Sequence, residues 1–489
     1  MNVFKVKLNN ILEKYKKGNI AIKASIWFTL CSIFQRGISV ITMPIFTRLM
    51  SISEFGEYNI FQTWYNILII IITLNVQSEI FNKGLIEHIE EKDKYTTNQM
   101  GLLIVLSSFF FLIYIVFYNI INHFMRLTII LIVIMFLEIL CNAIISIWLT
   151  RKRFDFEYKK IVILTMFMAI LNPVLGILMV SVSTAKAEAR IISNAIVPFC
   201  IAIILLIIYR KKGKLFDEYH WWKTSVKISI PLIPHYLSLV LLNQSDKLMI
   251  NSFIGSEKTA IYSVAHSAGL LMTIINTSIN NTFVPYIYKK IKNNDFEGVK
   301  LITSLISLII AIVNVFLIWF APEAIKLLAP SQYYEAIWCL VPIAVSVYCF
   351  FIYTLFVDIE IYYGANSFVA IASICAALAN IVLNFIFIPK YGYIVAGYTT
   401  LVSYFLTMVL HYIFMRRVIK HKKSDGKLFN EKIIIIIFLG LIIMSIIAML
   451  LYNQFIIRYL IVFIIIYILI KKYHSFIFIL KELKKEGIK

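Results

Sequence analysis

Charged residues are scarce in this chain, and their scarcity argues against a soluble fold. They make up 15% of the 489 residues, whereas hydrophobic residues make up 61%, and the mean hydropathy is +0.85. An average soluble domain carries roughly 25% charged and 45–50% apolar residues. A single soluble core cannot hide this excess of apolar side chains, so lipid must surround much of the surface.

Cysteine and histidine are too few and too scattered to build a disulfide framework or a metal site. The six cysteines all fall in apolar segments, and no two of them form a CxxC pair. His235, His266 and His411 stand apart from one another in the sequence. Neither pattern has the spacing of zinc ligands. The sequence therefore predicts no metal and no cofactor.

Acidic residues are outnumbered, with 26 Asp and Glu against 47 Lys and Arg, a net charge of +21. A strongly basic balance can indicate nucleic-acid binding. Here the basic residues stand in short clusters between apolar runs, as they do in the cytoplasmic loops of membrane proteins. We therefore expect membrane lipids as the surroundings and no nucleic-acid partner.

Long apolar runs recur along the whole chain. A helix needs about 20 apolar residues to cross a bilayer, and on this measure we expect about fourteen transmembrane helices. They run over 23–46, 57–81, 101–121, 127–149, 161–182, 191–209, 227–254, 259–287, 300–321, 337–363, 366–388, 392–415, 433–452 and 455–471. The sequence thus predicts an all-α polytopic membrane protein.

The basic clusters alternate with these spans. They occupy the N-terminal segment, the loops after the fourth, sixth, eighth and twelfth spans, and the C-terminal tail. Lys and Arg resist translocation across the membrane. The alternation predicts a multi-pass membrane protein with both termini in the cytoplasm.

Polar side chains recur at helical spacing inside several spans. Ser32, Gln35, Arg36 and Ser39 share one face of the first span. The second, fourth, seventh and eighth spans carry Gln62, Asn66, Thr73, Gln77, Glu138, Asn142, Ser146, Asn243, Asp246, Lys247, His266, Thr273, Thr277 and Asn280. Such residues can simply join helices by hydrogen bonds. The number of stripes favours the other interpretation, a shared water-filled cavity that they line.

Two cations in these stripes are candidate substrate-binding residues. Arg36 lies near the middle of its span, where an arginine costs about 2.5–3.5 kcal/mol on insertion scales. It could bind an anion in the cavity, or it could form a structural ion pair with Glu138. Lys247 could bind an anion too, or pair with Asp246, or snorkel to the interface. The two carboxylates, Asp246 and Glu138, are the candidates for coupling transport to a proton or cation.

Several motifs resemble a known family. The chain is similar to the polysaccharide transporter branch of the MOP (MATE-like) exporter superfamily, the Wzx-type flippases of O-antigen and capsule precursors. The motifs that carry the resemblance are Met43-Pro44-Ile45-Phe46-Thr47-Arg48-Leu49-Met50, Glu54-Phe55-Gly56-Glu57-Tyr58, Asp246-Lys247-Leu248-Met249-Ile250, Ala260-Ile261-Tyr262-Ser263-Val264 and Tyr391-Gly392-Tyr393-Ile394-Val395-Ala396-Gly397-Tyr398.

The resemblance implies two six-helix bundles around a central cleft, alternating access, and an undecaprenyl-diphosphate-linked oligosaccharide as cargo. It also implies that the protein lies in the bacterial inner (plasma) membrane. It also implies that Arg36 and Lys247 hold the diphosphate, and other polysaccharide-assembly proteins are potential partners. The expected segments are a cytoplasmic amphipathic segment 1–22, bundles 23–209 and 227–415 joined by a cytoplasmic linker 210–226, a basic loop 416–432, two additional transmembrane helices 433–471 and a basic tail 472–489.

The sequence is also compatible with two other functions. A MATE-type antiporter of drugs or metabolites would share the fold, and its often cationic cargo would favour acidic cavity residues. A membrane-bound polysaccharide polymerase or acyltransferase would need a cluster of acid, base or nucleophilic groups. The sequence displays no such cluster, and the longest outer loop is the short stretch from Pro322 to Ala336. We therefore do not expect an enzyme.

Overall fold

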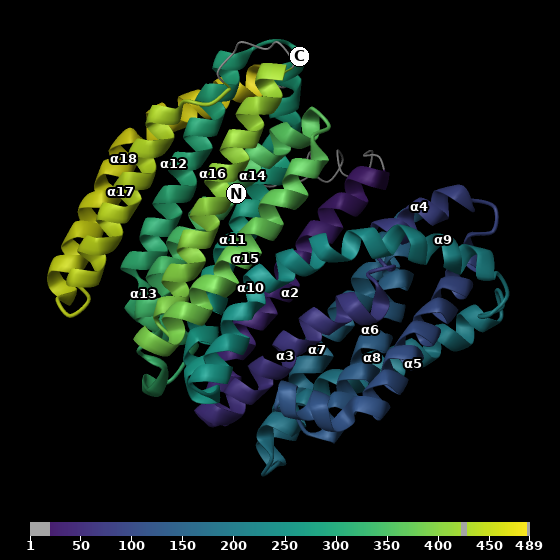
Figure 1. Ribbon diagram of the computed structural model, residues 1–489. Helices are drawn as coiled ribbons and strands as arrows, with labels where there is room; N and C mark the ends of the chain where they lie inside the picture. Colours follow the sequence, from purple (N-terminus) through teal and green to yellow (C-terminus); the bar gives the residue numbers. More distant parts are fainter. Residues whose placement is uncertain (1–19, 422–427, 487–489) are drawn as a thin grey trace, which may run out of the picture. The chain divides into compact units, whose positions relative to one another are not determined.

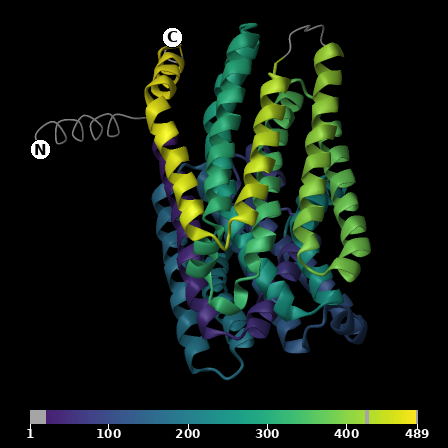
Figure 2. The same ribbon diagram turned by 90° about the vertical axis from the view of Figure 1, so that its left-hand side faces the viewer.

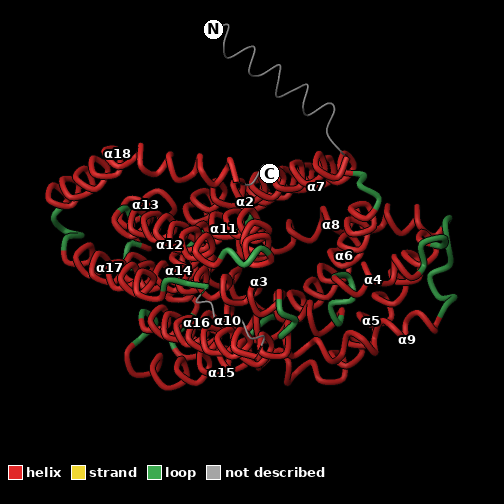
Figure 3. Tube along the Cα trace, turned by 90° about the horizontal axis from the view of Figure 1, so that it is seen from above, coloured by secondary structure: helices red, strands yellow, loops and turns green. Residues whose placement is uncertain are grey.

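The computed structural model describes residues 20–421 and 428–486, and within these residues only helices and connecting turns occur (Figure 3). The expected all-α fold is confirmed. The chain divides into two compact units, Met1–Val240 and Leu241–Lys489. The division falls inside helix α10 (Ile233–Phe253), not in a loop. Most of the expected amphipathic segment 1–22 and part of the loop 416–432 lie outside the described residues.

The first unit is built from long helices with two short ones at one end (Figure 1). Its elements are α2 (Ile20–Leu49), α3 (Ile52–Thr73), α4 (Glu79–Glu87), α5 (Lys92–Met125), α6 (Ile129–Phe154), α7 (Tyr158–Val182), α8 (Lys186–Arg210), α9 (Tyr219–Ser229), the 3₁₀ turn η1 (Ile230–Leu232) and the first part of α10. Helix α6 packs against α8, α7 against α8, and α2 against α7. The short helices α4 and α9 both pack against α5.

The second unit centres on α14, which packs against α11, α12, α15, α16 and α17. Its elements after α10 are α11 (Ser256–Lys292), α12 (Phe296–Trp319), α13 (Ala321–Leu328), η2 (Ser331–Tyr333), α14 (Ala336–Tyr362), α15 (Asn366–Tyr391), α16 (Val395–His421), α17 (Glu431–Leu450) and α18 (Phe455–Glu486). Helices α17 and α18 are joined by a short turn, from which they diverge (Figure 2). Helix α18 continues well beyond the expected span 455–471, into the basic tail.

Eleven helices of the described residues are long and apolar enough to cross a membrane. The long helices α3 and α11 coincide with two of the remaining expected spans but are less apolar than this measure requires, and α18 coincides with the last expected span. The polytopic membrane architecture is therefore confirmed, and the count of fourteen stays a prediction.

Two helix ends differ from the sequence expectation. The second span was expected to reach residue 81, but α3 ends at Thr73, and Leu74 and Asn75 have positive φ angles of 50° and 53°. The left-handed conformation of these residues ends the helix. The first span is expected to end at residue 46, yet α2 continues through Pro44 to Leu49. The expected seventh span, 227–254, is not one continuous α-helix, because the 3₁₀ turn η1, which contains Pro231, lies between α9 and α10.

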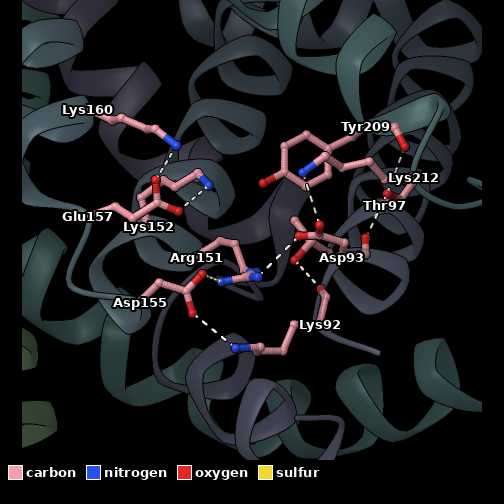
Figure 4. A network of polar contacts seen from close by, with 11 residues as sticks. Lys92, Asp93, Thr97, Arg151, Lys152, Asp155, Glu157, Lys160, Tyr209 and Lys212 are labelled. Atoms are coloured by element: carbon pink, nitrogen blue, oxygen red, sulfur yellow. Dashed lines mark hydrogen bonds and ion pairs between the residues drawn. The ribbon is translucent and has the colours of Figure 1, made fainter. Parts of the chain in front are cut away.

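One end of the first unit carries a network of ion pairs (Figure 4). Arg151, at the end of α6, lies 3.2 Å from Asp93 at the start of α5 and also contacts Asp155. Lys92 lies 3.1 Å from Asp155, and Lys212, just after α8, lies 3.0 Å from Asp93. The network therefore joins the start of α5 to the ends of α6 and α8.

These contacts set the charge of the Asp155 carboxyl. Burial by itself raises the pKa of Asp155, but the hydrogen bonds and charges of Arg151 and Lys92 outweigh it and hold the pKa below its ordinary value. The resulting stabilisation is present above the unfolded carboxyl pKa of about 4 and is lost as the pH falls through the folded value.

Polar contacts also join helix ends at other connections of the two units. In the first unit, Lys186 Nζ at the start of α8 donates to the Leu49 carbonyl oxygen at the end of α2, at 2.7 Å. In the second unit, Lys258 near the start of α11 lies 2.7 Å from Glu335 before α14. The Tyr393 hydroxyl, after α15, donates to the same carboxylate at 2.6 Å. In each unit, these contacts join connections between helices that lie at the same end of the unit.

The segment expected to be a linker, 210–226, is docked against the first unit. The Trp222 indole N–H donates to the Asn98 carbonyl oxygen at 2.9 Å, and the Ser225 hydroxyl donates to the Gln99 side-chain oxygen at 3.1 Å. The Leu215 carbonyl group packs closely against Gly101 of α5, because a Cβ atom at Gly101 would lie 1.8 Å from the Leu215 carbonyl oxygen. The segment is therefore a packed part of this unit and not a loose tether.

Candidate functional site

The polar face of α2 is exposed within the described residues. The Ser32 and Ser39 hydroxyls donate to carbonyl oxygens one turn earlier in α2, at 3.0 and 3.1 Å, and Gln35 is half-buried. The Arg36 side chain is exposed, and no ion pair joins it to Glu138 or to any other described residue. The alternative interpretation, a structural pair between Arg36 and Glu138, therefore finds no support here.

The polar residues expected on the second span separate into two groups. Gln62 and Asn66 are half-buried on α3. Gln77 is buried, but it lies in the turn between α3 and α4, where its backbone oxygen accepts from the Thr150 hydroxyl of α6 at 3.5 Å. The expectation that Gln77 continues the α3 stripe is wrong, because the helix ends at Thr73.

Glu138 of α6 is 5% exposed, and a second buried charge, Arg190 of α8, lies within its electrostatic range. The Arg190 guanidinium is centred 4.0 Å from the Phe46 ring of α2 and 5.4 Å from the Tyr58 ring of α3. Gly176 of α7 gives it room, because a Cβ atom there would lie 2.3 Å from Arg190 Nη1.

Arg190 was missed by sequence reasoning. It stands at the expected boundary between a loop and the sixth span, where a basic residue is ordinary. The structure buries it because α8 begins earlier, at Lys186, and brings its second turn against the aromatic rings of α2 and α3.

In the second unit, Asp246 of α10 is the centre of a buried polar cluster. Its carboxylate accepts from the Tyr262 hydroxyl of α11 at 2.5 Å and from the Thr400 hydroxyl of α16 at 2.6 Å. The Asn384 amide of α15 donates to the other carboxylate oxygen at 2.5 Å. Asn380, one turn before Asn384, accepts from the Asn384 amide at 3.2 Å. Four helices therefore converge on one carboxylate.

The sequence-predicted residues lie around this cluster to different degrees. Lys247 is 8% exposed, and its ammonium donates to the Gln244 side-chain oxygen at 3.3 Å, so it does not snorkel. His266 is buried, and its ring stacks on Tyr262 with the centroids 6.1 Å apart. The Asn243 side-chain oxygen accepts from the Tyr404 hydroxyl at 2.9 Å.

The other predicted residues of α11 lie further along the helix. Thr273 is half-buried and Thr277 is exposed, and their hydroxyls donate to carbonyl oxygens of α11 itself at 2.6 and 2.7 Å. Asn280 is half-buried and interacts with Asp358 of α14. These residues are not brought to Asp246.

The Asp246 cluster can hold a hard cation or a proton. Carboxylate, amide and hydroxyl oxygens are the ligands that such cations prefer. Within the described residues no group of three or more His, Cys, Asp or Glu side chains could hold a metal ion, so a site for a softer transition metal is not formed there. Asn380, Asn384 and Thr400 were missed because their polarity alone does not reveal which helix they face.

The comparisons with known proteins fit this architecture. Residues 21–290 match the family of polysaccharide biosynthesis proteins. Protein 1 of the Lsg locus of Haemophilus influenzae is 18% identical over 374 residues, which cover 74% of this chain and 88% of the relative.

Two solved structures have the same fold. The lipid II flippase MurJ in an inward closed conformation has a TM-score of 0.58 and 16% identity, covering 90% of this chain and 100% of that one. An inward-facing multidrug resistance MATE family transporter of the MOP superfamily has a TM-score of 0.58 and 13% identity, covering 81% of this chain and 96% of that one. Because the family match spans more than half of its length, the chain belongs to the polysaccharide biosynthesis protein family, and it has the fold of the MOP superfamily.

Proposed function

We propose that the chain is a flippase that moves an undecaprenyl-diphosphate-linked oligosaccharide from the cytoplasmic to the outer leaflet for surface-polysaccharide assembly. The observation that carries the proposal is membership of the polysaccharide biosynthesis protein family over residues 21–290. The fold shared with the lipid II flippase MurJ supports a lipid-linked cargo. Alternating access between two bundles around a central cleft is the mechanism that we propose.

In this proposal the cations bind the diphosphate of the carrier. Arg36 is exposed on a polar face of α2, although the helix is otherwise apolar. A guanidinium offers a planar fork of donors that matches phosphate oxygens. Lys247 is the second proposed cation. The residues proposed to line the cavity are Ser32, Gln35, Ser39, Gln62, Asn66, Asn243, His266, Thr273, Thr277 and Asn280.

The proposed surroundings are the bacterial inner membrane, with both termini in the cytoplasm. Reporter fusions should place the turns at Arg151 and Arg416 inside and those at Lys186 and Lys326 outside. The reason is the resistance of basic clusters to translocation. An outside signal at Arg151 would overturn this orientation, because that residue belongs to the network at one end of the first unit.

We further propose that Asp246 couples transport to a cation or proton, with Glu138 as the second candidate. Asp246→Asn keeps the volume and removes the charge, so ion dependence of transport should be lost and the rate should fall about tenfold or more. Transport into vesicles or cells at varied pH and Na⁺ measures it. Asp217→Asn is the control, because Asp217 is an exposed loop carboxylate. If Asp246→Asn and Glu138→Gln both leave transport and its ion dependence unchanged, neither residue couples it.

Deletion of the gene in its native host tests the function itself. The proposal expects lipid-linked oligosaccharide to accumulate on the cytoplasmic leaflet and surface polysaccharide to disappear. Other polysaccharide-assembly proteins, the potential partners, would then lack their substrate but would remain active.

A MATE-type antiporter of small molecules is the second candidate, favoured by the MATE transporter with an equal TM-score of 0.58. If the chain had this function, deletion of the gene should make the cells sensitive to drugs and leave the surface polysaccharide normal. If the chain were a membrane-bound polymerase or acyltransferase, deletion of the gene should leave short or unmodified polysaccharide that still reaches the surface.

A further inference from the structure

The buried guanidinium of Arg190 joins several helices of the first unit. Arg190 of α8 is 8% exposed, and its guanidinium is centred 4.0 Å from the Phe46 ring of α2 and 5.4 Å from the Tyr58 ring of α3. A Cβ atom at Gly176 of α7 would lie 2.3 Å from Arg190 Nη1 and 3.1 Å from Phe46 Cζ. One side chain of α8 therefore packs against three other helices.

Hydrogen bonds satisfy this guanidinium only in part. Arg190 Nη1 donates to the Ser193 hydroxyl oxygen at a long 3.4 Å, and Nε is buried without a hydrogen-bond partner among the described residues. A buried cation is costly unless its surroundings stabilise it. The face of an aromatic ring within about 6 Å attracts a cation, most strongly where water is excluded. The Arg190 charge therefore depends on the two rings, together with the attraction of the Glu138 carboxyl.

Neighbouring contacts fix both rings against α8. The Asn194 amide, one turn after Arg190, donates to the Tyr58 hydroxyl oxygen at 3.2 Å. Lys186, one turn before Arg190, donates from Nζ to the Leu49 carbonyl oxygen at the end of α2, at 2.7 Å. The first two turns of α8 thus contact the last turn of α2 through both Lys186 and Arg190.

The rest of α2 has few buried side chains. From Ile26 to Leu49, all of which the structure describes, only Cys31, Phe46 and Thr47 are buried. Two of these three lie in the last turn, beside Arg190. Helix α2 packs mainly on α7 and only slightly on α3. The docking of its last turn is therefore the main contact that sets where α2 lies in this unit.

Arg36 lies on the same continuous helix as Phe46. The two residues are ten positions apart, which corresponds to about 15 Å along the helix axis and roughly 80° around it. The exposed Arg36 side chain has no comparable buried contact of its own. A shift or rotation of α2 at Phe46 would consequently move the Arg36 guanidinium.

We propose that Arg190 is a positioning residue, which fixes the last turn of α2 and thereby sets the height and rotation of Arg36. Its own guanidinium is covered by the Phe46 and Tyr58 rings, so it acts through α2. The use of this contact in transport rests on the proposed function, but the placement of α2 does not.

Double electron–electron resonance measures the placement of α2 in the full-length protein in nanodiscs, without any transport assay. Nitroxide labels are attached at Ile41→Cys of α2 and Ile163→Cys of α7, two positions that are 68% and 70% exposed. The exposed Cys200 and Cys375 are first replaced by serine. Wild-type contacts at Arg190 should give one narrow distribution of distances between the labels.

Arg190→Met keeps the length of the side chain and removes its charge, whereas Phe46→Leu keeps an apolar side chain and removes the ring. Each should shift the ratio of docked to displaced α2 about tenfold or more, visible as a second or broadened distance. The double variant should add little to the larger single effect, because both changes remove one contact. Arg190→Lys keeps the charge but not the planar guanidinium, so its shift should be smaller.

Arg210→Met is the matched control, because Arg210 is an exposed arginine at the other end of α8 and should leave the distances unchanged. If Arg190→Met fails to accumulate, Phe46→Leu tests the same contact from α2. Wild-type distances in these variants overturn the proposal. A lower midpoint of thermal unfolding with wild-type distances does so too, because Arg190 would then stabilise the fold without positioning α2.

Transport measured against the concentration of lipid-linked oligosaccharide tests the consequence for Arg36. Arg190→Met should raise the concentration that gives half-maximal transport. In an Arg36→Lys background the same change should have a smaller effect, because Arg190 acts through Arg36. Losses that simply multiply would overturn this role. Normal polysaccharide display after deletion of the gene would instead reject the proposed function and leave the distance result unaffected.

Discussion

We expect Arg36→Ala to abolish surface-polysaccharide display while the protein still accumulates in the membrane. The guanidinium is a permanent cation on an exposed polar face near the middle of α2. Charge-assisted hydrogen bonds are worth about 1.5–3 kcal/mol each, so losing two of them to a diphosphate would slow flipping roughly 100-fold or more. The loss should not depend on which sugar the carrier bears.

The conservative variant sharpens this test. Arg36→Lys keeps the charge but loses the two-pronged geometry, so we expect partial function. Arg210→Ala is the matched control, because Arg210 is an exposed arginine at the end of α8. Complementation of polysaccharide display, with membrane protein quantified alongside, measures all three variants.

A structural role would produce a different pattern. If Arg36 served only as a partner of Glu138, Arg36→Ala would lower protein abundance, and adding Glu138→Gln would restore it. The absence of an ion pair between the two argues against that outcome. Normal display from Arg36→Ala at normal abundance would exclude Arg36 as the diphosphate-binding residue.

The second large effect concerns folding and not transport. Gly101→Ala should destabilise the first unit, because a Cβ atom there would lie 1.8 Å from the Leu215 carbonyl oxygen and 2.7 Å from its carbon. These are backbone atoms, so no flexible side chain can move aside. Overpacking of this kind costs about 1–3 kcal/mol, and more when backbone must shift. We expect a lower midpoint of thermal unfolding and poor accumulation.

Gly440→Ala in α17 is the matched control, since nothing lies within 4 Å of a Cβ atom at that position. Alanine there should be neutral or slightly stabilising, because it favours helix over glycine by up to about 1 kcal/mol. Wild-type accumulation and melting of Gly101→Ala would mean that the segment after α8 does not pack on α5 as the structure shows.

The long apolar runs and the basic clusters could be read directly from the sequence. A run such as Ile433 to Leu451 has no stable alternative to a helix in lipid, because each backbone group must find its partner within the same segment. Local sequence signals were insufficient at Thr73, where α3 ends in a left-handed turn made by Leu74 and Asn75.

The partners of the polar residues were decided by the tertiary structure alone. Asp246 could be singled out as a carboxylate inside a span, but its contacts with Asn384 and Thr400 lie 138 and 154 residues away. His411 looked isolated, yet it pairs with Glu360 across 51 residues. Hydropathy and charge act locally along one helix, and they determine that it forms and crosses the membrane. Which face meets which neighbour depends on the packing of whole helices, where single contacts such as Gly397 against Pro342 decide the approach.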